Sequence, residues 1–588
     1  MTVFGGFERI RQALRARGVR GVAVLASGVA LTVLMVYGIV FPLDGLTADE
    51  GYDMGDTGQM VWNLWHTAEA VQSGRSPFWT DRIYYPKGAN LGAHTLSSGY
   101  VPIVLLVKMV TLGSAMYPVY ALNVVVLIAY FAILAFTYLL LREVGYGFLA
   151  SAIPAVGYAF CDFYYLHWLH LNHLAGFCLP LVAWLLVRLV ERPTCGRGLA
   201  VTAALAWSVY LTEFALSIGI AALLFLLASA TTAESRTLLK STVTALGFLR
   251  LAGLTVLLAL AVSPFVVAFF GAGVEPPQKE DFSFLSANLA GLAVPDPSST
   301  WLYGSLFTPL AARVTAGLGG WETFCGFPML LFAAVGVASR KPVYARFALG
   351  VALVFFALSL GPSLKVLDRD TGIPLPYAGL MEIPPFDQNR SPVRFAVIGL
   401  FFLTFLVAQG LERFDHLLRG TRGKTLSTAL LLAVLVWTGL ETYSRPTKPH
   451  RSFTFPTELR GLVKGPVLSV SLQDRACNDA LYQVFHHQPI VGGCLARTTR
   501  GQRLQMARLR AAFAGNLDDF ERQLRRLGVR NRVGRRAAVC QPVVPPAADG
   551  REPRRAARLA TGGPRPGAGL SVRLSPVSGN GREPGETP

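Results

Sequence analysis

The chain has 588 residues, of which 52% are hydrophobic and only 15% are charged. The apolar residues form long runs instead of the spaced stripe of a soluble helix, which indicates a membrane protein with several spans. The net charge of +19 comes mostly from basic residues between these runs and in the tail, so membrane topology accounts for it and nucleic acid is not an expected partner. The sequence has no phosphate-binding loop of the G-x-x-x-x-G-K-[ST] type, which argues against a nucleotide-sugar enzyme and an ATP-driven transporter.

The first apolar run, residues 22–42, matches the roughly 20 residues that a spanning helix needs. It follows a basic segment and ends without a small-x-small cleavage site, so we expect a retained anchor with residues 1–21 in the cytoplasm. Later runs bring the prediction to about eleven spans. They cover residues 117–141, 148–166, 174–190, 199–212, 214–231, 246–272, 324–339, 343–362, 394–411 and 426–443.

The short loops between these runs test the predicted orientation. With the N-terminus inside, the connections LREVGYG, VERPTCGRG, ESRTLLK, SRKPVYAR and ERFDHLLRGTRGKT all fall on the cytoplasmic side, where Lys and Arg are enriched. The run from Val101 is short and contains Lys108, so we expect a re-entrant or interfacial helix there. The transmembrane region, residues 22–443, then has three large outer loops, at 43–116, 273–323 and 363–393.

The last part of the chain lies beyond the predicted spans. Residues 444–530 are predicted to form a small extracytoplasmic α/β domain, with an extended GPVLSVSL segment and an amphipathic helix around LDDFERQLRRLGVR. A disulfide between Cys477 and Cys494 is an open alternative if this domain faces an oxidising compartment. Residues 531–588 are rich in Arg, Pro, Gly and Ala and have no aromatic residue, so we expect a disordered tail.

Several outer segments carry the most distinctive sequence: GDTGQMVWNLW, SPFWTDRIYYPKGANLGAHTLS, ANLAGLAVPDPSSTWL, IPLPYAGLMEIPPFDQNRSPVRF and YQVFHHQPIVGG. They resemble a family of bacterial multi-pass membrane proteins in the GT-C class of glycosyltransferases, which take a sugar from a polyprenyl-phosphate carrier. The resemblance covers most of residues 45–530. It implies an all-α polytopic, GT-C-like fold and an inverting transferase of the bacterial inner membrane, with a catalytic carboxylate in the first outer loop. The acceptor would be an envelope glycan, lipid or protein.

The chemistry of glycosyl transfer also calls for a carboxylate. Transfer of a sugar from phosphate to an acceptor hydroxyl needs one base, because the hydroxyl proton has to leave as the new bond forms. Phosphate leaves readily, so one Asp or Glu with cationic groups for the phosphate is sufficient.

Asp56 is the first candidate for this base, because its neighbours in GDTG let the backbone approach a ligand closely. Two alternatives stay open for Asp56: an N-cap of the helix that follows, and a ligand of a divalent cation together with Asp53. Apart from that cation, no cofactor is expected. Asp53 and Glu50 are the next candidates for the base, whereas Asp49 and Glu69 are expected to be solvated.

Aromatic and basic residues of the first outer loop are candidates for substrate binding. Trp65 belongs to an aromatic series that could stack on sugar faces, with the interfacial belt of membrane proteins as the alternative. Arg82, Lys87 and His94 could meet a phosphate or pyrophosphate, and the alternative for them is an ordinary loop charge.

A later outer segment, PPFDQNRSPVRF, offers two arginines just before a predicted span. Guanidinium groups bind phosphate in a bidentate manner and stay charged, so Arg390 and Arg394 are predicted to hold the lipid phosphate. A salt bridge with Asp387 is the alternative. Lys365 is a weaker candidate for the same task.

The segment FYYLHWLHLNHLAG places His167, His170 and His173 at steps of three. Each step on a regular α-helix turns about 300°, so the outer pair diverges by about 120° and we expect no metal site. Substrate or lipid-headgroup binding by His170 and Asn172 is one alternative, and packing at the outer membrane edge is the other. Glu213 lies at a turn between two predicted spans, which makes it a further candidate for substrate binding or a partner of a histidine.

Two other classes of function stay open. A lipid or polysaccharide flippase or exporter needs polar groups through the membrane interior, and runs such as VVVLIAYFAILAFTYLL carry almost none. The other class is a non-catalytic membrane protein of envelope assembly. The preferred prediction is a glycosyltransferase that binds a polyprenyl-phosphate-linked sugar among membrane lipids.

Overall fold

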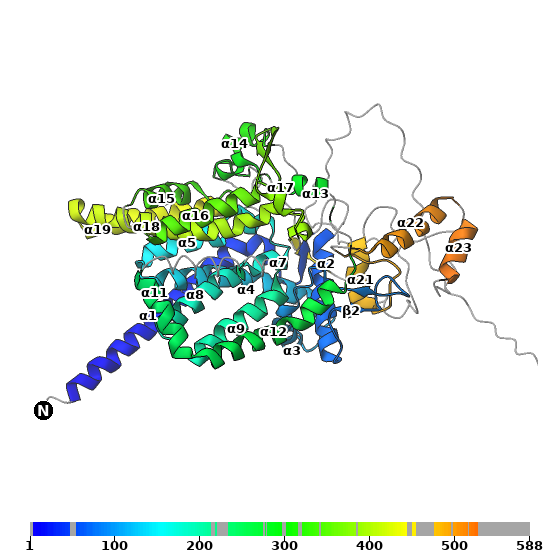
Figure 1. Ribbon diagram of the computed structural model, residues 1–588, viewed down its shortest axis with the longest axis horizontal. Coiled ribbons are helices and arrows are strands. Elements are labelled where there is room, and N and C mark those ends of the chain that lie inside the picture. The colour runs from blue at the N-terminus through cyan, green and yellow to red at the C-terminus, as the bar shows by residue number, and fades with distance from the viewer. Residues whose placement is uncertain are drawn as a thin grey trace, which may run out of the picture.

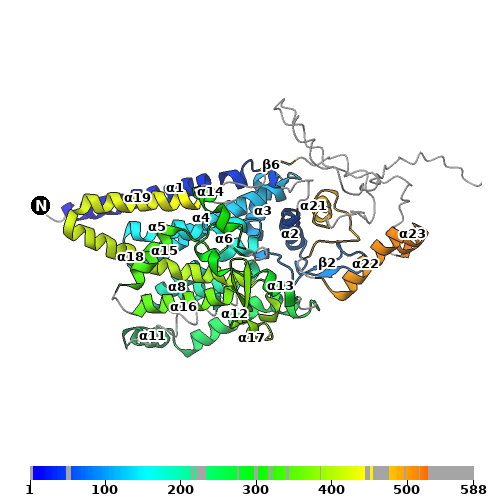
Figure 2. The same cartoon turned by 90° about the horizontal axis from the view of Figure 1, so that it is seen from above.

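The structure is a computed structural model, and it is mostly helical (Figure 1). The helices α18 (Ala396–Arg422) and α19 (Lys424–Thr442) run along the long axis, and α1 (Phe4–Val40) is inclined to it. The N-terminus lies at the opposite end from α2 (Gly55–Gln72) and α21 (Ala476–His486), as the view from above also shows (Figure 2). The structure describes residues 4–47, 55–212, 218–219, 233–274, 277, 279–296, 302–314, 320, 322–339, 343–383, 386–443, 450–453, 476–495, 498–515 and 517–526.

The remaining helices divide into apolar helices of the bundle and shorter helices around its outer end. The bundle contains α4 (Tyr117–Glu143), α5 (Phe148–Ala159), α8 (Cys178–Glu191), α9 (Cys195–Leu211), α11 (Ala233–Leu246), α12 (Phe248–Phe270), α15 (Phe327–Val337) and α16 (Val343–Ser359). The shorter set contains α3 (Val101–Val110), α6 (Asp162–Leu166), α7 (Leu171–Leu174), α13 (Lys279–Phe284), α14 (Gly304–Ala311), α17 (Tyr377–Leu380), α22 (Arg500–Gly515) and α23 (Leu517–Arg526).

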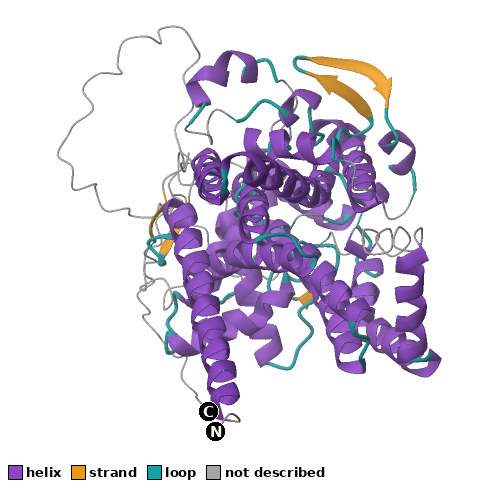
Figure 3. Cartoon of the chain, turned by 90° about the vertical axis from the view of Figure 1, so that its left-hand side faces the viewer, coloured by secondary structure: helices purple, strands orange, loops and turns teal. Residues whose placement is uncertain are grey.

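Strands and 3-10 turns make up little of the described chain (Figure 3). The sheets are two-stranded and antiparallel: β1 (Gly45–Thr47) pairs with β6 (His450–Ser452), β2 (Trp79–Thr80) with β3 (Ala89–Asn90), and β4 (Ser363–Val366) with β5 (Arg369–Pro374). The 3-10 turns are η1 (Ser98–Tyr100), η2 (Ala175–Phe177), η3 (Leu289–Leu292), η4 (Phe386–Gln388) and η5 (Pro392–Phe395).

The structure confirms the predicted class, an all-α polytopic membrane protein. Among the described residues, 6 helices are long and apolar enough to cross a membrane: Gly21–Val40, Tyr117–Glu143, Leu171–Glu191, Phe248–Phe270, Pro392–Arg419 and Lys424–Thr442. Four more predicted spans contain helices of 11 to 17 residues, namely α5, α9, α15 and α16. The predicted span at 214–231 lies almost wholly outside the described residues. The total of about eleven spans therefore stays a prediction.

The core of the bundle is formed around α18, whose first half is almost fully buried. It packs against α15 through two glycines. A Cβ added at Gly336 would lie 2.0 Å from the carbonyl oxygen of Leu406, and one added at Gly410 would lie 1.9 Å from that of Phe332. The two backbones are thus in direct contact, which is how small residues bring membrane helices together.

The helix α3 has 10 residues and is about 15 Å long, which is too short to cross a bilayer. Its Lys108 forms an ion pair of 2.8 Å with Glu69 at the end of α2. The Glu69 carboxylate also accepts a hydrogen bond from the Tyr117 hydroxyl at 3.3 Å. The expectation that Glu69 is a solvated loop charge was therefore wrong, because α3 and the start of α4 bring partners to it.

The C-terminal segment packs directly on the first outer loop. The Trp62 indole donates to Gln483 of α21 at 2.7 Å, and the Tyr84 hydroxyl donates to the Gly493 carbonyl at 3.0 Å. A Cβ at Gly58 would lie 2.5 Å from the Cys477 carbonyl oxygen, so α21 touches the first turns of α2. The predicted GPVLSVSL strand and residues 531–588 lie outside the described residues, and the domain boundary at 444 stays a prediction.

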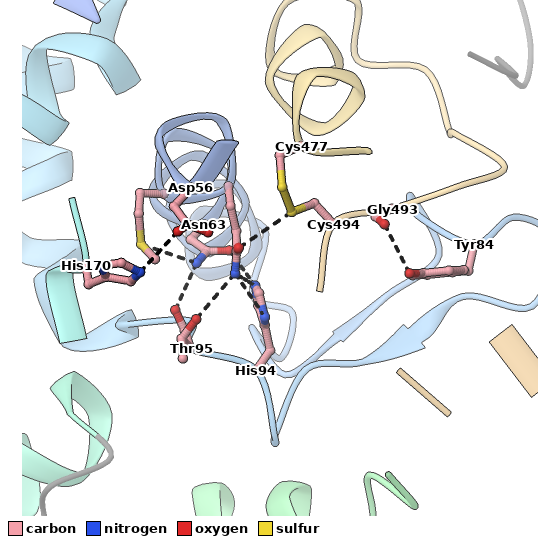
Figure 4. The surroundings of a disulfide bond; sticks show 11 residues. Asp56, Asn63, Tyr84, His94, Thr95, His170, Cys477, Gly493 and Cys494 are labelled. Atoms are coloured by element: carbon pink, nitrogen blue, oxygen red, sulfur yellow. Dashed lines mark hydrogen bonds and ion pairs between the residues drawn. A yellow bond between two sulfur atoms is a disulfide. The ribbon is translucent and has the colours of Figure 1, made fainter. Parts of the chain in front are cut away.

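The structure confirms the disulfide between Cys477 and Cys494, whose Cα atoms are 4.8 Å apart. It joins the first turn of α21 to the segment that follows Gly493 (Figure 4). Since this segment also contacts Tyr84, the disulfide holds the C-terminal part of the chain beside the first outer loop.

Candidate functional site

Asp56 lies in the first turn of α2, directly after Gly55, whose φ is +42°. Its Oδ2 is 3.1 Å from Nε2 of His170, and its side chain is 49% exposed (Figure 4). The hydrogen bond from His170 lowers the pKa of Asp56, and the charges of Arg390 and His167 lower it further against the opposing effect of burial. Asp56 is therefore an ionised carboxylate at neutral pH that a ligand can reach.

The two predicted phosphate-binding arginines approach this position from the segment before α18. Arg390 is close enough to Asp56 for its charge to act on the carboxylate. Arg394 is close enough to His173 for their charges to interact. Asp56 and the two arginines, from distant parts of the sequence, thus lie within electrostatic range of one another or of the histidine cluster. Lys365 is in β4, and its ammonium group donates a hydrogen bond to the Ser283 carbonyl.

The three histidines do not lie on one regular helix, contrary to the expectation. The helix α6 ends at Leu166, α7 begins at Leu171, and His170 between them has an extended backbone with φ −90° and ψ 91°. The imidazole ring centroids are 4.5 to 5.2 Å apart. The predicted divergence was wrong because the helix breaks between the histidines, which turns the rings toward one another.

The histidine cluster extends to a second carboxylate, Glu322, which no sequence pattern singles out. Nε2 of His167 is 2.8 Å from Oε2 of Glu322, and the Glu322 side chain is 4% exposed. Nδ1 of His167 lies 3.4 Å from Nδ1 of His170. A continuous chain of polar contacts therefore runs from buried Glu322 through two imidazoles to half-exposed Asp56.

His94 lies beneath α2 in a buried network and not on an exposed surface (Figure 4). Its Nε2 is 2.8 Å from Oδ1 of Asn63, and the Asn63 amide donates to the Thr95 carbonyl at 2.9 Å. Burial lowers the pKa of His94 to about 3, and burial also lowers the pKa of nearby His66 to about 4. These contacts hold the GAHTLS segment against α2, so His94 has a structural role in this segment.

These two pKa values predict acid sensitivity of the outer loop. Between pH 6.5 and about 4 the unfolded chain binds protons at both histidines while the folded chain does not, so stability falls as the pH falls through this window. The loss is up to about 1.4 kcal/mol per histidine for each pH unit. Thermal unfolding in detergent at pH 7, 6 and 5 measures it. We expect the variant with both His66→Gln and His94→Gln to show a flatter dependence than His416→Gln, and parallel curves would contradict this assignment.

No family model and no curated protein matches this chain. Among solved structures, it is similar to the archaeal oligosaccharyltransferase AglB from Archaeoglobus fulgidus, in complex with an inhibitory peptide and a dolichol-phosphate. The TM-score is 0.45, and the sequences are 14% identical over 86% of this chain and 68% of that chain. It is also similar to ArnT from Cupriavidus metallidurans bound to undecaprenyl phosphate, with a TM-score of 0.38 and 12% identity over 80% of this chain and 85% of that chain. Both are glycosyltransferases of the GT-C class, the class that the outer segments resemble.

Two of the predicted binding residues, Trp65 and Arg82, lie further along α2 from Asp56. Trp65 is buried, and the Arg82 guanidinium stacks 4.7 Å from the centre of its ring. Lys87 is exposed in the turn between β2 and β3. Trp65 comes nine residues after Asp56, which is about 14 Å along a helix axis. Trp65 and Arg82 are therefore not gathered with Asp56.

The other candidates are placed only in part. Asn172 is buried on α7 beside His173. Asp53, Glu50 and Glu213 lie outside the described residues, so the suggested cation between Asp53 and Asp56 has no described second ligand.

Proposed function

We propose that this protein is a membrane glycosyltransferase that moves a sugar from a polyprenyl-phosphate donor to an envelope glycan, lipid or protein, with Asp56 as the general base. The observation that carries the proposal is the position of Asp56: an ionised, half-exposed carboxylate within electrostatic range of Arg390. A base and a phosphate-binding cation are the two groups that this transfer needs. The donor class is the one that the outer segments imply by their resemblance.

A base and a phosphate-binding cation account for every proton and electron pair that moves in the reaction. The acceptor oxygen attacks the anomeric carbon of the sugar from the face opposite the phosphate, and its proton passes to the Asp56 carboxylate. The bond from that carbon to the phosphate oxygen breaks, and its electrons leave with the polyprenyl phosphate. Arg390 and Arg394 stabilise the negative charge that grows on the phosphate. His170 holds Asp56 in place and favours its ionised form before the reaction.

The disulfide supports an outer location for this site. Disulfides persist in oxidising compartments and are rare in the cytoplasm. Cys477 lies against Gly58, two residues after Asp56 in α2, so the disulfide and the site share one end of the molecule. The N-terminus lies at the other end (Figure 1). We therefore place residues 1–21 in the cytoplasm and Asp56 at the outer face of the bacterial inner membrane.

Arg390→Ala tests the phosphate-binding part of the proposal. Removal of a hydrogen-bonding partner of a charged group costs about 1.5–3 kcal/mol, so we expect kcat/KM for the lipid donor to fall by about 10- to 100-fold. Transfer from a polyprenyl-phosphate sugar to acceptor in detergent or proteoliposomes measures it. Arg369→Ala, at an exposed position of β5, is the matched control and should keep wild-type activity. An Arg390→Ala enzyme with an unchanged kcat/KM would show that this arginine does not hold the phosphate.

The same assay separates the proposal from a flippase or exporter. A flippase moves the intact lipid-linked sugar across proteoliposomes, whereas a transferase releases polyprenyl phosphate and leaves the sugar on the acceptor. Release of the carrier without transbilayer movement is the expected result.

A further inference from the structure

We infer that His167, His170 and His173 bind one divalent transition-metal ion of the zinc class, with Glu322 and Asp56 orienting two of the imidazoles. This site stands on its own geometry and does not depend on the proposed transferase activity. The side-chain nitrogens of the three histidines that could act as ligands all lie within 4.8 Å of one another.

Carboxylates lie beside His167 and His170, and the one beside His170 fixes where that ring carries its proton. Nε2 of each ring faces a carboxylate oxygen, at 2.8 Å for Glu322 and 3.1 Å for Asp56. Ionised Asp56 only accepts hydrogen bonds, so Nε2 of His170, which donates to it, carries the hydrogen of that ring. In a neutral imidazole the other nitrogen, Nδ1, then presents a bare lone pair. The contact of His167 with Glu322 is a close approach without hydrogen-bond alignment.

The Nδ1 atoms of His167 and His170 face each other. Nδ1 of His167 and Nδ1 of His170 are 3.4 Å apart. A cation bound between these two nitrogens would take one lone pair from each ring. Two nitrogens bound to a tetrahedral zinc ion at about 2.05 Å are themselves separated by about 3.4 Å.

The third ligand comes from His173 on α7. Its ring centroid lies 4.5 Å from that of His167 and 4.9 Å from that of His170, and its side chain is almost fully buried. Three imidazoles are a ligand set for zinc and similar transition metals, whereas magnesium and calcium prefer oxygen ligands. Three protein ligands also leave a fourth position for water or another oxygen ligand.

The two carboxylates complete the arrangement. A metal-bound histidine almost always donates its second N–H to a carboxylate, carbonyl or water, which fixes the ring and raises its basicity. Asp56 is a partner of this kind for His170. Glu322, at 4% exposed, lies 2.8 Å from Nε2 of His167 and would take the same role once a bound ion orients the ring. The competing arrangement is a single proton shared by the two Nδ1 atoms across their 3.4 Å separation.

Metal analysis decides between an ion and a proton. The protein is purified without a histidine tag, incubated with ZnCl2 in excess MgCl2, desalted and analysed by inductively coupled plasma mass spectrometry. We expect about one zinc per wild-type chain and less than about 0.1 in the variant with His167→Ala and His170→Ala. His416→Ala removes an exposed histidine of α18 and should retain the wild-type content.

A milder variant guards against loss of folding. Glu322→Gln keeps the side-chain volume and all three histidines, and we expect it to weaken zinc binding by about 10- to 100-fold in competition with a chromophoric chelator. A wild-type chain that keeps no more zinc than the double-histidine variant overturns the inference, and so does a Glu322→Gln affinity equal to that of wild type. Neither result bears on transfer by Asp56, which is measured separately.

Discussion

Asp56→Asn is expected to lower kcat/KM for glycosyl transfer by about 10²- to 10⁴-fold, because the amide cannot take the proton of the acceptor hydroxyl. The substitution keeps the size of the side chain and an oxygen that can accept the hydrogen bond from His170, so the packing around α2 should persist. Transfer from a polyprenyl-phosphate sugar, measured as radiolabelled product over a range of donor concentrations, gives the result.

Asparagine also separates the two alternatives for Asp56. Asn caps a helix about as well as Asp does, so a position that serves only as an N-cap would tolerate the change. Asp81→Asn, at an exposed acid of the same outer loop, is the matched control and should retain full transfer. Full transfer by Asp56→Asn, with expression and thermal unfolding like those of wild type, would falsify the assignment of the base.

Gly336→Val is the second change with a large expected effect, here on folding. The Cβ alone would lie 2.0 Å from the Leu406 carbonyl oxygen. A Cβ at the facing glycine, Gly410, would lie 1.9 Å from the Phe332 carbonyl oxygen. Neither helix can relax without separation of α15 from α18, so we expect a loss of about 3 kcal/mol or more. Gly350→Val on α16 is the control, because nothing lies within 4 Å of a Cβ there.

Fluorescence-detected size-exclusion chromatography after a heating series measures both glycine variants. The Gly336→Val protein should aggregate at a clearly lower temperature than wild type, and Gly350→Val should follow wild type within a few degrees. Equal melting temperatures for the two variants would contradict the direct backbone contact between α15 and α18.

The class of fold followed from the sequence because a soluble protein rarely contains so many long apolar runs. The lengths of the individual helices could not be predicted, because the hydropathy of an apolar run does not change where a helix ends inside it. The run 148–166 shows this: α5 stops at Ala159 and α6 begins at Asp162. The disulfide could be considered from the sequence, because Cys477 and Cys494 are close in sequence and lie in the predicted outer part.

The site was predictable only as separate pieces. Asp56 stood out through its glycine neighbours, and Arg390 through its position before a span. The approach of Asp56 to His170, and of Arg390 to Asp56, depends on packing between segments more than 100 residues apart, which periodicity does not report. Glu322 was missed because a single acid in a loop looks solvated, and His94 looked accessible for the same reason, although both are buried.

A structure of the protein with bound polyprenyl phosphate would show whether Arg390 and Asp56 form the donor site. We expect the lipid phosphate at about 3 Å from the Arg390 guanidinium, with the Asp56 carboxylate facing the space that the sugar would occupy. A phosphate bound instead at Arg82 and Lys108, at the far end of α2, would contradict the claim.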